Sequence, residues 1–218
     1  GLFGEILIMA GIHVCLEGVD GSGKTTLLKG LIKALEHADI SCKVVKMLGE
    51  GKIRETVLFD EHLTPKQRML LYKVAAETAR IEIEEAKHHH DVVLCERGEA
   101  SFVAYQGAGD QLLYEVKTLL SLFDPFPVPD LTFYLQIPVE LMQARLSGRG
   151  EAKDVFEQKD IAFFERVDQT YKKQMVKLLT QSFESVHFLD EIKSPEELIQ
   201  ETIHIVKSRV KKISHTEI

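Results

Sequence analysis

The sequence predicts an α/β fold in which a parallel sheet of five strands carries helices on both faces. Five short apolar segments have the character of buried strands, and segments with apolar residues at helical spacing separate them. Most polar residues of functional character follow the ends of these segments, where parallel sheets bind their ligands. The predicted strands cover residues 12–16, 41–47, 91–97, 129–135 and 185–189.

Composition limits the class of protein. The chain has 218 residues, 44% of them hydrophobic and 28% charged, which suits a single globular domain over residues 11–218. A net charge of −7 argues against a nucleic acid polymer as partner, and no apolar segment is long enough to span a membrane. Three cysteines without a C-x-x-C pair indicate reduced thiols and a cytoplasmic protein. Residues 1–10 form a short apolar extension outside the domain, without the pattern of a signal peptide.

The first predicted strand leads into a glycine-rich segment. Residues 18–25 read G-V-D-G-S-G-K-T and match G-x-x-x-x-G-K-[ST], the phosphate-binding loop, or P-loop. A helix follows, since leucines and isoleucine between residues 27 and 35 fall on one face. Strand, loop and helix N-terminus together favour a phosphate site of the P-loop NTPase type over a simple glycine-rich turn. The predicted nucleotide-binding residues are Gly18, Val19, Asp20, Gly21, Ser22, Gly23, Lys24, Thr25 and Thr26.

Within this loop two side chains have distinct chemistry. The ammonium of Lys24 would contact the β- and γ-phosphates, and the hydroxyl of Thr25 would bind Mg²⁺. ATP and Mg²⁺ are therefore the expected cofactors.

Helix starts can be read from capping residues. Leu63-Thr64-Pro65 predicts the start of a long helix that ends near Lys87, and a shorter helix is expected from about Lys52. Residues 139–146 predict another helix, and Ser194-Pro195-Glu196-Glu197 is a capping box that opens the last one.

Two later segments each have two interpretations. Glu96 and Arg97 end the third strand, where the carboxylate would assist Mg²⁺ beside Thr25, or the two residues form a surface ion pair. Residues 147–156 contain Arg149 between glycines. They form either a lid that closes on a transferring phosphoryl group or a solvated connection between helices.

Longer motifs resemble one family. Residues 17–26, E-G-V-D-G-S-G-K-T-T, look like the opening of thymidylate kinases. The pattern Glu96-Arg97-x-x-x-Ser101-x-x-Ala104-Tyr105-Gln106 resembles that family's D-R-[YF]-x-x-S-x-x-A-Y-Q. Residues 129–138 resemble its next strand and helix start, and the resemblance extends over about residues 11–175. It implies ATP- and Mg²⁺-dependent phosphorylation of dTMP to dTDP, and a homodimer.

The resemblance also implies roles for individual residues. Arg97 would hold the acceptor monophosphate, Asp20 the sugar 3′-hydroxyl, and Tyr105 the face where a 2′-hydroxyl would clash. Because the P-loop contains no arginine, Arg149 would act from the lid with support from Arg145. The implied catalytic residues are Lys24, Glu96, Arg97 and Arg149, with Thr25 and Glu96 at the metal. The implied substrate-binding residues are Asp20, Arg54, Tyr72, Arg80, Arg97, Ser101, Tyr105 and Gln106.

Several departures keep alternatives open. Glu96 replaces an aspartate, Gly98 replaces an aromatic residue, and the R-E-P-G-G-T loop of the family is missing. No arginine stands at the family's base-reading position near Tyr72, so we expect Arg80 to reach back to the base. A kinase for another nucleotide or a deoxynucleoside, and a nucleotide-binding regulatory protein without turnover, are the alternatives. Intact lid cations and the Glu96-Arg97 pair argue against the second.

Overall fold

The computed structural model describes residues 10–150, 153–182 and 185–210. The extension predicted over residues 1–10 lies almost entirely outside this part of the chain, as do residues 151 and 152 of the expected lid. The single-domain organisation over residues 11–218 stays a prediction.

A five-stranded sheet forms the centre of the fold, and every strand pair in it is parallel, as predicted. The strand order β2-β3-β1-β4-β5 places the first strand in the middle. The chain therefore fills one side of β1 before it crosses to the other. The strands are β1 (Ile12–Glu17), β2 (Cys42–Lys46), β3 (Val92–Glu96), β4 (Leu131–Gln136) and β5 (Val186–Asp190).

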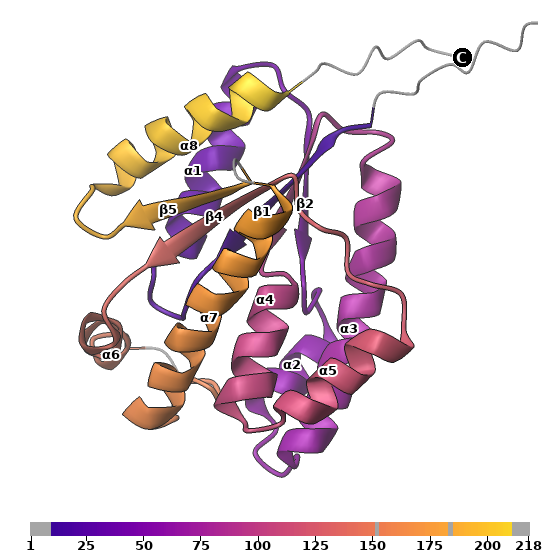
Figure 1. Cartoon of the computed structure of the whole chain (residues 1–218). Helices are drawn as coiled ribbons and strands as arrows, with labels where there is room; N and C mark the ends of the chain where they lie inside the picture. The colour runs from indigo at the N-terminus through magenta and orange to yellow at the C-terminus, as the bar shows by residue number, and fades with distance from the viewer. Residues whose placement is uncertain (1–9, 151–152, 183–184, 211–218) are drawn as a thin grey trace, which may run out of the picture.

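Helices cover both faces of this sheet (Figure 1), which confirms the predicted fold class. The helices of the first half of the chain are α1 (Lys24–His37), α2 (Lys52–Phe59), α3 (Pro65–Ala86), α4 (Glu99–Phe102), the π-helical η1 (Val103–Gly109) and α5 (Leu113–Leu122). Those of the second half are α6 (Val139–Ser147), α7 (Ile161–Gln181) and α8 (Pro195–Arg209). Among the described helices, none combines the length and hydropathy that crossing a membrane requires.

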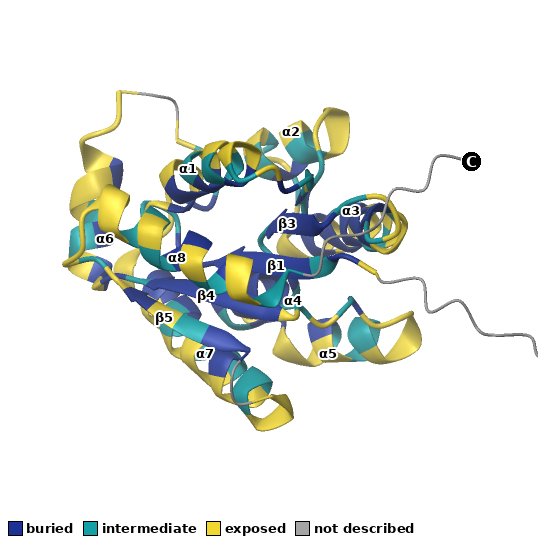
Figure 2. Ribbon diagram, turned by 90° about the horizontal axis from the view of Figure 1, so that it is seen from above, coloured by how far each residue is buried: buried dark blue, intermediate teal, exposed yellow. Residues whose placement is uncertain are grey.

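Alternating side chains of the strands build two cores. Val14 and Leu16 of β1 face α1 and α8, whereas Cys15 between them faces the layer of α3, α4, η1 and α7. Figure 2 shows the strands as the buried layer, with exposed residues on the outer sides of the helices. The three central strands β1, β3 and β4 are buried on both faces, which explains why their segments read as apolar runs, whereas the edge strands β2 and β5 are partly exposed.

Local signals fixed the helix starts. Thr64 forms a complete capping box with Gln67, and Pro65 occupies the first turn of α3. Ser194 and Glu197 do the same at the start of α8. The helices after β3 were not predicted: a four-residue α4 continues as η1 before α5 begins at Leu113. This π-helical segment carries Tyr105 and Gln106, and such segments are rare and often occur at functional sites.

Thr64 allows a test of how the cap supports α3. Thr64→Ala removes the side-chain acceptor for the Gln67 amide, so the free energy of unfolding should fall by about 1 kcal/mol. Urea unfolding measures this change. Thr64→Ser keeps the hydroxyl and should restore most of the loss, whereas equal losses in both variants would contradict the cap.

Candidate functional site

One cavity lies beyond the carboxyl ends of β1 and β3. The register pairs Leu16 with Glu96, so the P-loop after β1 and the residues after β3 meet at one edge. The cavity has a volume of about 150 Å³. Of the predicted site residues, those that line it are Asp20, Gly21, Gly23, Lys24, Thr25, Thr26, Arg54, Tyr72, Glu96, Arg97, Tyr105, Gln106 and Arg149.

The P-loop wraps around the side chain of its own lysine. Lys24 Nζ donates to the carbonyl oxygens of Gly18 at 2.7 Å and Val19 at 2.9 Å, and it lies 3.4 Å from Ser22 Oγ. Gly21 and Gly23 have φ values of 77° and 96°, which a residue with a Cβ adopts only at a cost. The wrapped loop keeps the ammonium at the floor of the cavity, where a phosphate group would enter.

Burial gives Lys24 unusual electrostatics. The side chain is almost inaccessible, and burial, aided by the charge of Arg97, lowers the pKa of Lys24 to about 7. An anion bound in this loop would favour the charged ammonium, because it would replace the lost hydration. The loop is therefore a site prepared for negative charge.

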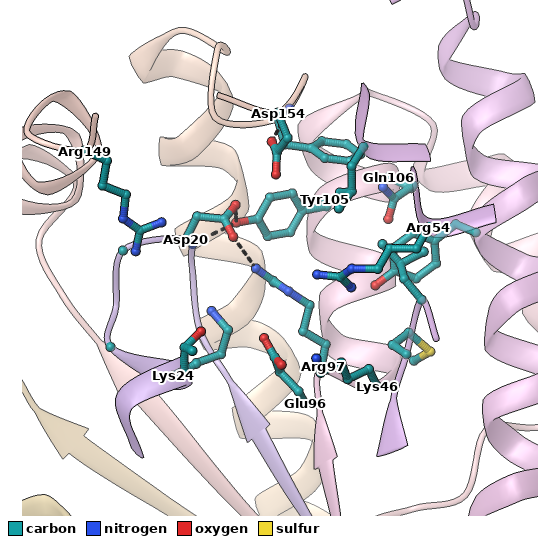
Figure 3. A pocket seen from close by; sticks show the side chains of 18 of the residues that line it. Asp20, Lys24, Lys46, Arg54, Glu96, Arg97, Tyr105, Gln106, Arg149 and Asp154 are labelled. Carbon is teal, nitrogen blue, oxygen red and sulfur yellow. Dashed lines mark hydrogen bonds and ion pairs between the residues drawn. The ribbon is translucent and has the colours of Figure 1, made fainter. Parts of the chain in front are cut away.

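A second cluster joins Asp20 of the loop to Arg97 and Tyr105, which follow β3 along the chain (Figure 3). Arg97 Nη2 lies 2.6 Å from Asp20 Oδ1, and the Tyr105 hydroxyl donates to Asp20 Oδ2 at 2.8 Å. The guanidinium also lies over the Tyr105 ring, 4.9 Å from its centroid. Although burial raises the pKa of Asp20, the charges of Arg97 and Lys24 outweigh it and lower that pKa below its ordinary value.

Two arginines approach the loop from α6 and the segment after it. Arg145 Nη1 donates to Gly21 O at 3.0 Å, and Arg149 lines the cavity with its guanidinium 3.3 Å from Glu157 Oε1. About half of the Arg149 side chain is exposed, so it can change position at little cost. Asp154 and Phe156, which follow in the same segment, line the cavity as well.

At the far end, the cavity is bounded by α2, α3 and η1. Tyr72 packs flat on Phe102 with 5.3 Å between ring centroids, and it lines the cavity with Leu58. Gln106 is fully buried, and neither of its amide atoms has a hydrogen-bond partner among the described residues. An unpaired buried amide that faces a cavity is a group that a polar ligand would satisfy.

Two expected substrate-binding residues lie elsewhere. Arg80 is not among the described residues that line the cavity, because carboxylates of α3 and of the segment after α5 hold its side chain elsewhere. Its partners are Glu77, Glu84 and Asp124, at 2.5, 2.9 and 3.4 Å. The expectation that it reaches back to the base is therefore wrong.

Ser101 is buried behind Arg97 rather than in the cavity. Its hydroxyl donates to Glu17 Oε2 at 2.5 Å, and it lies 2.7 Å from the Tyr171 hydroxyl. Gly18, Val19, Ser22 and Arg145 likewise shape the loop without lining the cavity described here.

Other residues of the site were missed. Lys46, Asp154 and Phe156 line the cavity, and burial, with the nearby Asp20 charge, raises the pKa of Asp154 to about 6. The D-V-F-E segment was a usable signal for Asp154 and Phe156, since it resembles the family's D-R-F-E. Tyr171 arrives from α7, and its spacing predicts only core packing.

A P-loop after the central strand, an arginine–aspartate–tyrosine cluster across one cavity and an arginine-bearing segment above it together define a P-loop nucleotide kinase. The family model described as thymidylate kinase matches residues 16–203. The chain therefore belongs to the thymidylate kinase family, whose members are phosphotransferases that act on small nucleotides.

Curated relatives agree with this family. The thymidylate kinase of Exiguobacterium sp. is 35% identical over 167 residues, which cover 73% of this chain and 78% of the relative. The thymidylate kinase of Acinetobacter baylyi is 32% identical over 210 residues, which cover 91% of this chain and 100% of the relative.

Solved structures support the fold. The thymidylate kinase of Candida albicans superposes with a TM-score of 0.71 at 20% identity, covering 91% of this chain and 92% of that one. The thymidylate kinase of Ehrlichia chaffeensis superposes with a TM-score of 0.65 at 19% identity, covering 91% of this chain and 99% of that one.

The low pKa of Lys24 predicts a pH dependence of stability. In the unfolded chain Lys24 has its ordinary pKa of 10.5, whereas in the folded protein its pKa is about 7. The unfolded state then binds more protons, so the free energy of unfolding should rise between pH 7 and 9 through this group. Urea unfolding of the wild type and Lys24→Met at both pH values isolates the effect. Parallel pH profiles of the two proteins would contradict the lowered pKa.

Proposed function

We propose that this protein transfers the γ-phosphoryl group of ATP to dTMP in the presence of Mg²⁺, giving dTDP and ADP. The family supports the reaction, and one observation carries it at the level of residues. Lys24 of the P-loop lines the same cavity as Arg97 and Tyr105, and Asp20 of the loop binds both of these side chains. Phosphoryl transfer needs alignment and charge neutralisation rather than a covalent protein group, and this arrangement offers both.

On the donor side, Lys24 and the loop amides would bind the phosphates of ATP. Thr25 and Glu96 both line the cavity beside Lys24, and a hydroxyl and a carboxylate are hard oxygen donors that fit Mg²⁺. The ion, when bound, would neutralise phosphate charge during transfer. Arg145, bonded to Gly21 O, would keep the loop in place from outside.

On the acceptor side, Arg97 and Arg54 would bind the monophosphate of dTMP. Asp20 keeps its charge beside Arg97 and Lys24, so its carboxylate can accept the hydrogen bond of a sugar 3′-hydroxyl. Tyr105 is held by Asp20 from below, and its buried ring would exclude a 2′-hydroxyl. This would favour deoxynucleotides.

Gln106 takes the place that we first gave to Arg80. It is the buried polar group at the far end of the cavity, close to Tyr72 and Leu58, which would pack against the base. A carboxamide offers one donor and one acceptor edge, which matches the N3–H and O4 groups of thymine. Because the side-chain amide can flip and so exchange its donor and acceptor groups, it would discriminate among pyrimidines less strictly than an arginine.

Release of ADP in a coupled assay across nucleoside monophosphates and deoxynucleosides tests the proposal. We expect dTMP to be the best acceptor, and Lys24→Ala and Arg97→Ala to abolish turnover while the far-ultraviolet circular dichroism stays unchanged. Preference for a purine monophosphate or a deoxynucleoside would support another kinase. Nucleotide binding without turnover of any acceptor would support a regulatory protein.

Arg149 should act mainly on the transition state. Its side chain is about half exposed, and the guanidinium would leave Glu157 for the charge that develops on the transferred group. Arg149→Ala should lower kcat on the order of 10³-fold with a small change in the KM for ATP. Lys159→Ala, a nearby cation that pairs with Asp110, is the control and should leave kcat within twofold. A variant defective only in the KM for ATP would assign Arg149 to ground-state binding.

Gln106 and Arg80 make a matched pair for base recognition. Gln106→Leu keeps the volume but removes both amide edges, so kcat/KM for dTMP should fall about tenfold, the effect of about one hydrogen bond. Arg80→Ala should leave kcat/KM unchanged, because Arg80 is bound to carboxylates outside the cavity. Steady-state kinetics with dTMP and dCMP measure both effects. A larger loss of kcat/KM in Arg80→Ala than in Gln106→Leu would instead assign base recognition to Arg80.

Two broader proposals rest on the family resemblance and on chemistry. The protein would act as a homodimer. Its cysteines at positions 15, 42 and 95 are free thiols, which suits the reducing cytoplasm.

A further inference from the structure

The main chain of Arg97 is held in an unfavourable conformation. Its φ of 67° lies in the left-handed region, which a residue with a Cβ adopts only at a steric cost. The residue follows β3 directly, and its amide still donates to Leu16 O of β1 at 2.9 Å. The surrounding structure must therefore fix this turn, since the local sequence does not favour it.

Glu17, the last residue of β1, fixes the turn from behind. Its Oε1 accepts the amide hydrogen of Gly98 at 2.7 Å, and its Oε2 accepts the Ser101 hydroxyl at 2.5 Å. Burial raises the pKa of Glu17, while the hydrogen bonds from Ser101 and Gly98 and the charge of Arg97 oppose that rise, and both carboxyl oxygens accept a hydrogen bond. A Cβ on Gly98 would lie 3.1 Å from Oε1, so the glycine at this position lets the carboxylate approach the backbone.

Tyr171 connects this carboxylate to the Arg97 guanidinium. Arg97 Nη1 donates to the Tyr171 hydroxyl at 3.0 Å, and that hydroxyl lies 2.7 Å from Ser101 Oγ. Because Ser101 gives its own hydrogen to Glu17, Tyr171 is the donor in the Ser101 contact, and its one hydrogen is shared between Ser101 Oγ and Gly18 O. The hydrogen bonds then run in one direction, from guanidinium through two hydroxyls to carboxylate, and such chains strengthen their members.

The two ends of the guanidinium are thus held separately. Asp20 binds Nη2 in the cavity, whereas Tyr171 binds Nη1 on the buried side. The Tyr171 hydroxyl also lies 3.3 Å from Gly18 O, so the same group touches the P-loop. We infer that Glu17 and Tyr171 are positioning residues that orient Arg97 toward the acceptor phosphate and couple it to the P-loop. The inference rests on the proposed function, in which Arg97 binds that phosphate.

Tyr171→Phe removes only the hydroxyl. The ring should keep its packing on Tyr134 and Tyr105, whose centroids lie 5.5 and 6.3 Å away. The dissociation constant of dTMP in calorimetry, and its KM, should rise about tenfold while the KM for ATP stays within twofold. Tyr134→Phe is the matched control: it removes another buried tyrosine hydroxyl, which bonds Asp168 instead, and should leave dTMP binding unchanged.

A double-mutant cycle separates positioning from general structural support. If Tyr171 acts through Arg97, Tyr171→Phe should have little further effect on dTMP binding in an Arg97→Lys background. Glu17→Gln should behave in the same way, and it carries the test if Tyr171→Phe does not fold. The inference would be overturned if the effects of Tyr171→Phe and Arg97→Lys on dTMP binding multiply in the double variant. It would also be overturned if Tyr171→Phe weakens ATP and dTMP binding equally, or if Tyr134→Phe weakens dTMP binding as much as Tyr171→Phe does. If the wild type prefers another acceptor monophosphate, the proposed function fails, and the same cycle with that acceptor still decides the positioning role.

Discussion

The ion pair between Arg97 and Asp20 is the interaction on which the site depends. It joins the loop after β1 to the turn after β3 at 2.6 Å, and both residues line the cavity. Both side chains are largely buried, so removing one partner leaves an uncompensated charge, which costs far more than the pair contributes. Tyr105, Tyr171 and Lys24 are all placed relative to this pair.

Positive charge dominates the cavity because its expected ligands are phosphates. Lys24, Arg54, Arg97 and Arg149 line it, and the buried carboxylates of Asp20 and Glu17 compensate part of that charge. Burial, and after it the charge of Arg97, lowers the pKa of Lys24 to about 7. A protein whose net charge is −7 thus concentrates cations at one place, which directs anionic substrates there without making the whole surface basic.

Two residues that the sequence analysis expected to bind substrate, Arg80 and Ser101, do not line the cavity. Arg80 was expected in the cavity because its spacing along α3 was close to suitable, but carboxylates on its own helix and Asp124 bind it first. Ser101 belongs to a motif with substrate-contacting residues, yet it bonds Glu17 in the layer behind. Glu77 and Glu84 lie one turn away from Arg80 and could have been read from the sequence, whereas the contacts with Asp124 and between Ser101 and Glu17 depend on the tertiary structure.

The sequence by itself determined the five parallel strands, the P-loop and the capped starts of α3 and α8, because each depends on a pattern within about ten residues. It also indicated Lys24, Thr25, Asp20 and Arg97 as one site, since strand ends of a parallel sheet meet at one edge. Only the tertiary structure decided that Gln106 lines the cavity whereas Arg80 does not, and that Tyr171 and Glu17 stand behind Arg97. Those contacts join residues 70 or more positions apart, such as Ser101 and Tyr171, and they form only when α7 packs on the layer of α4 and η1.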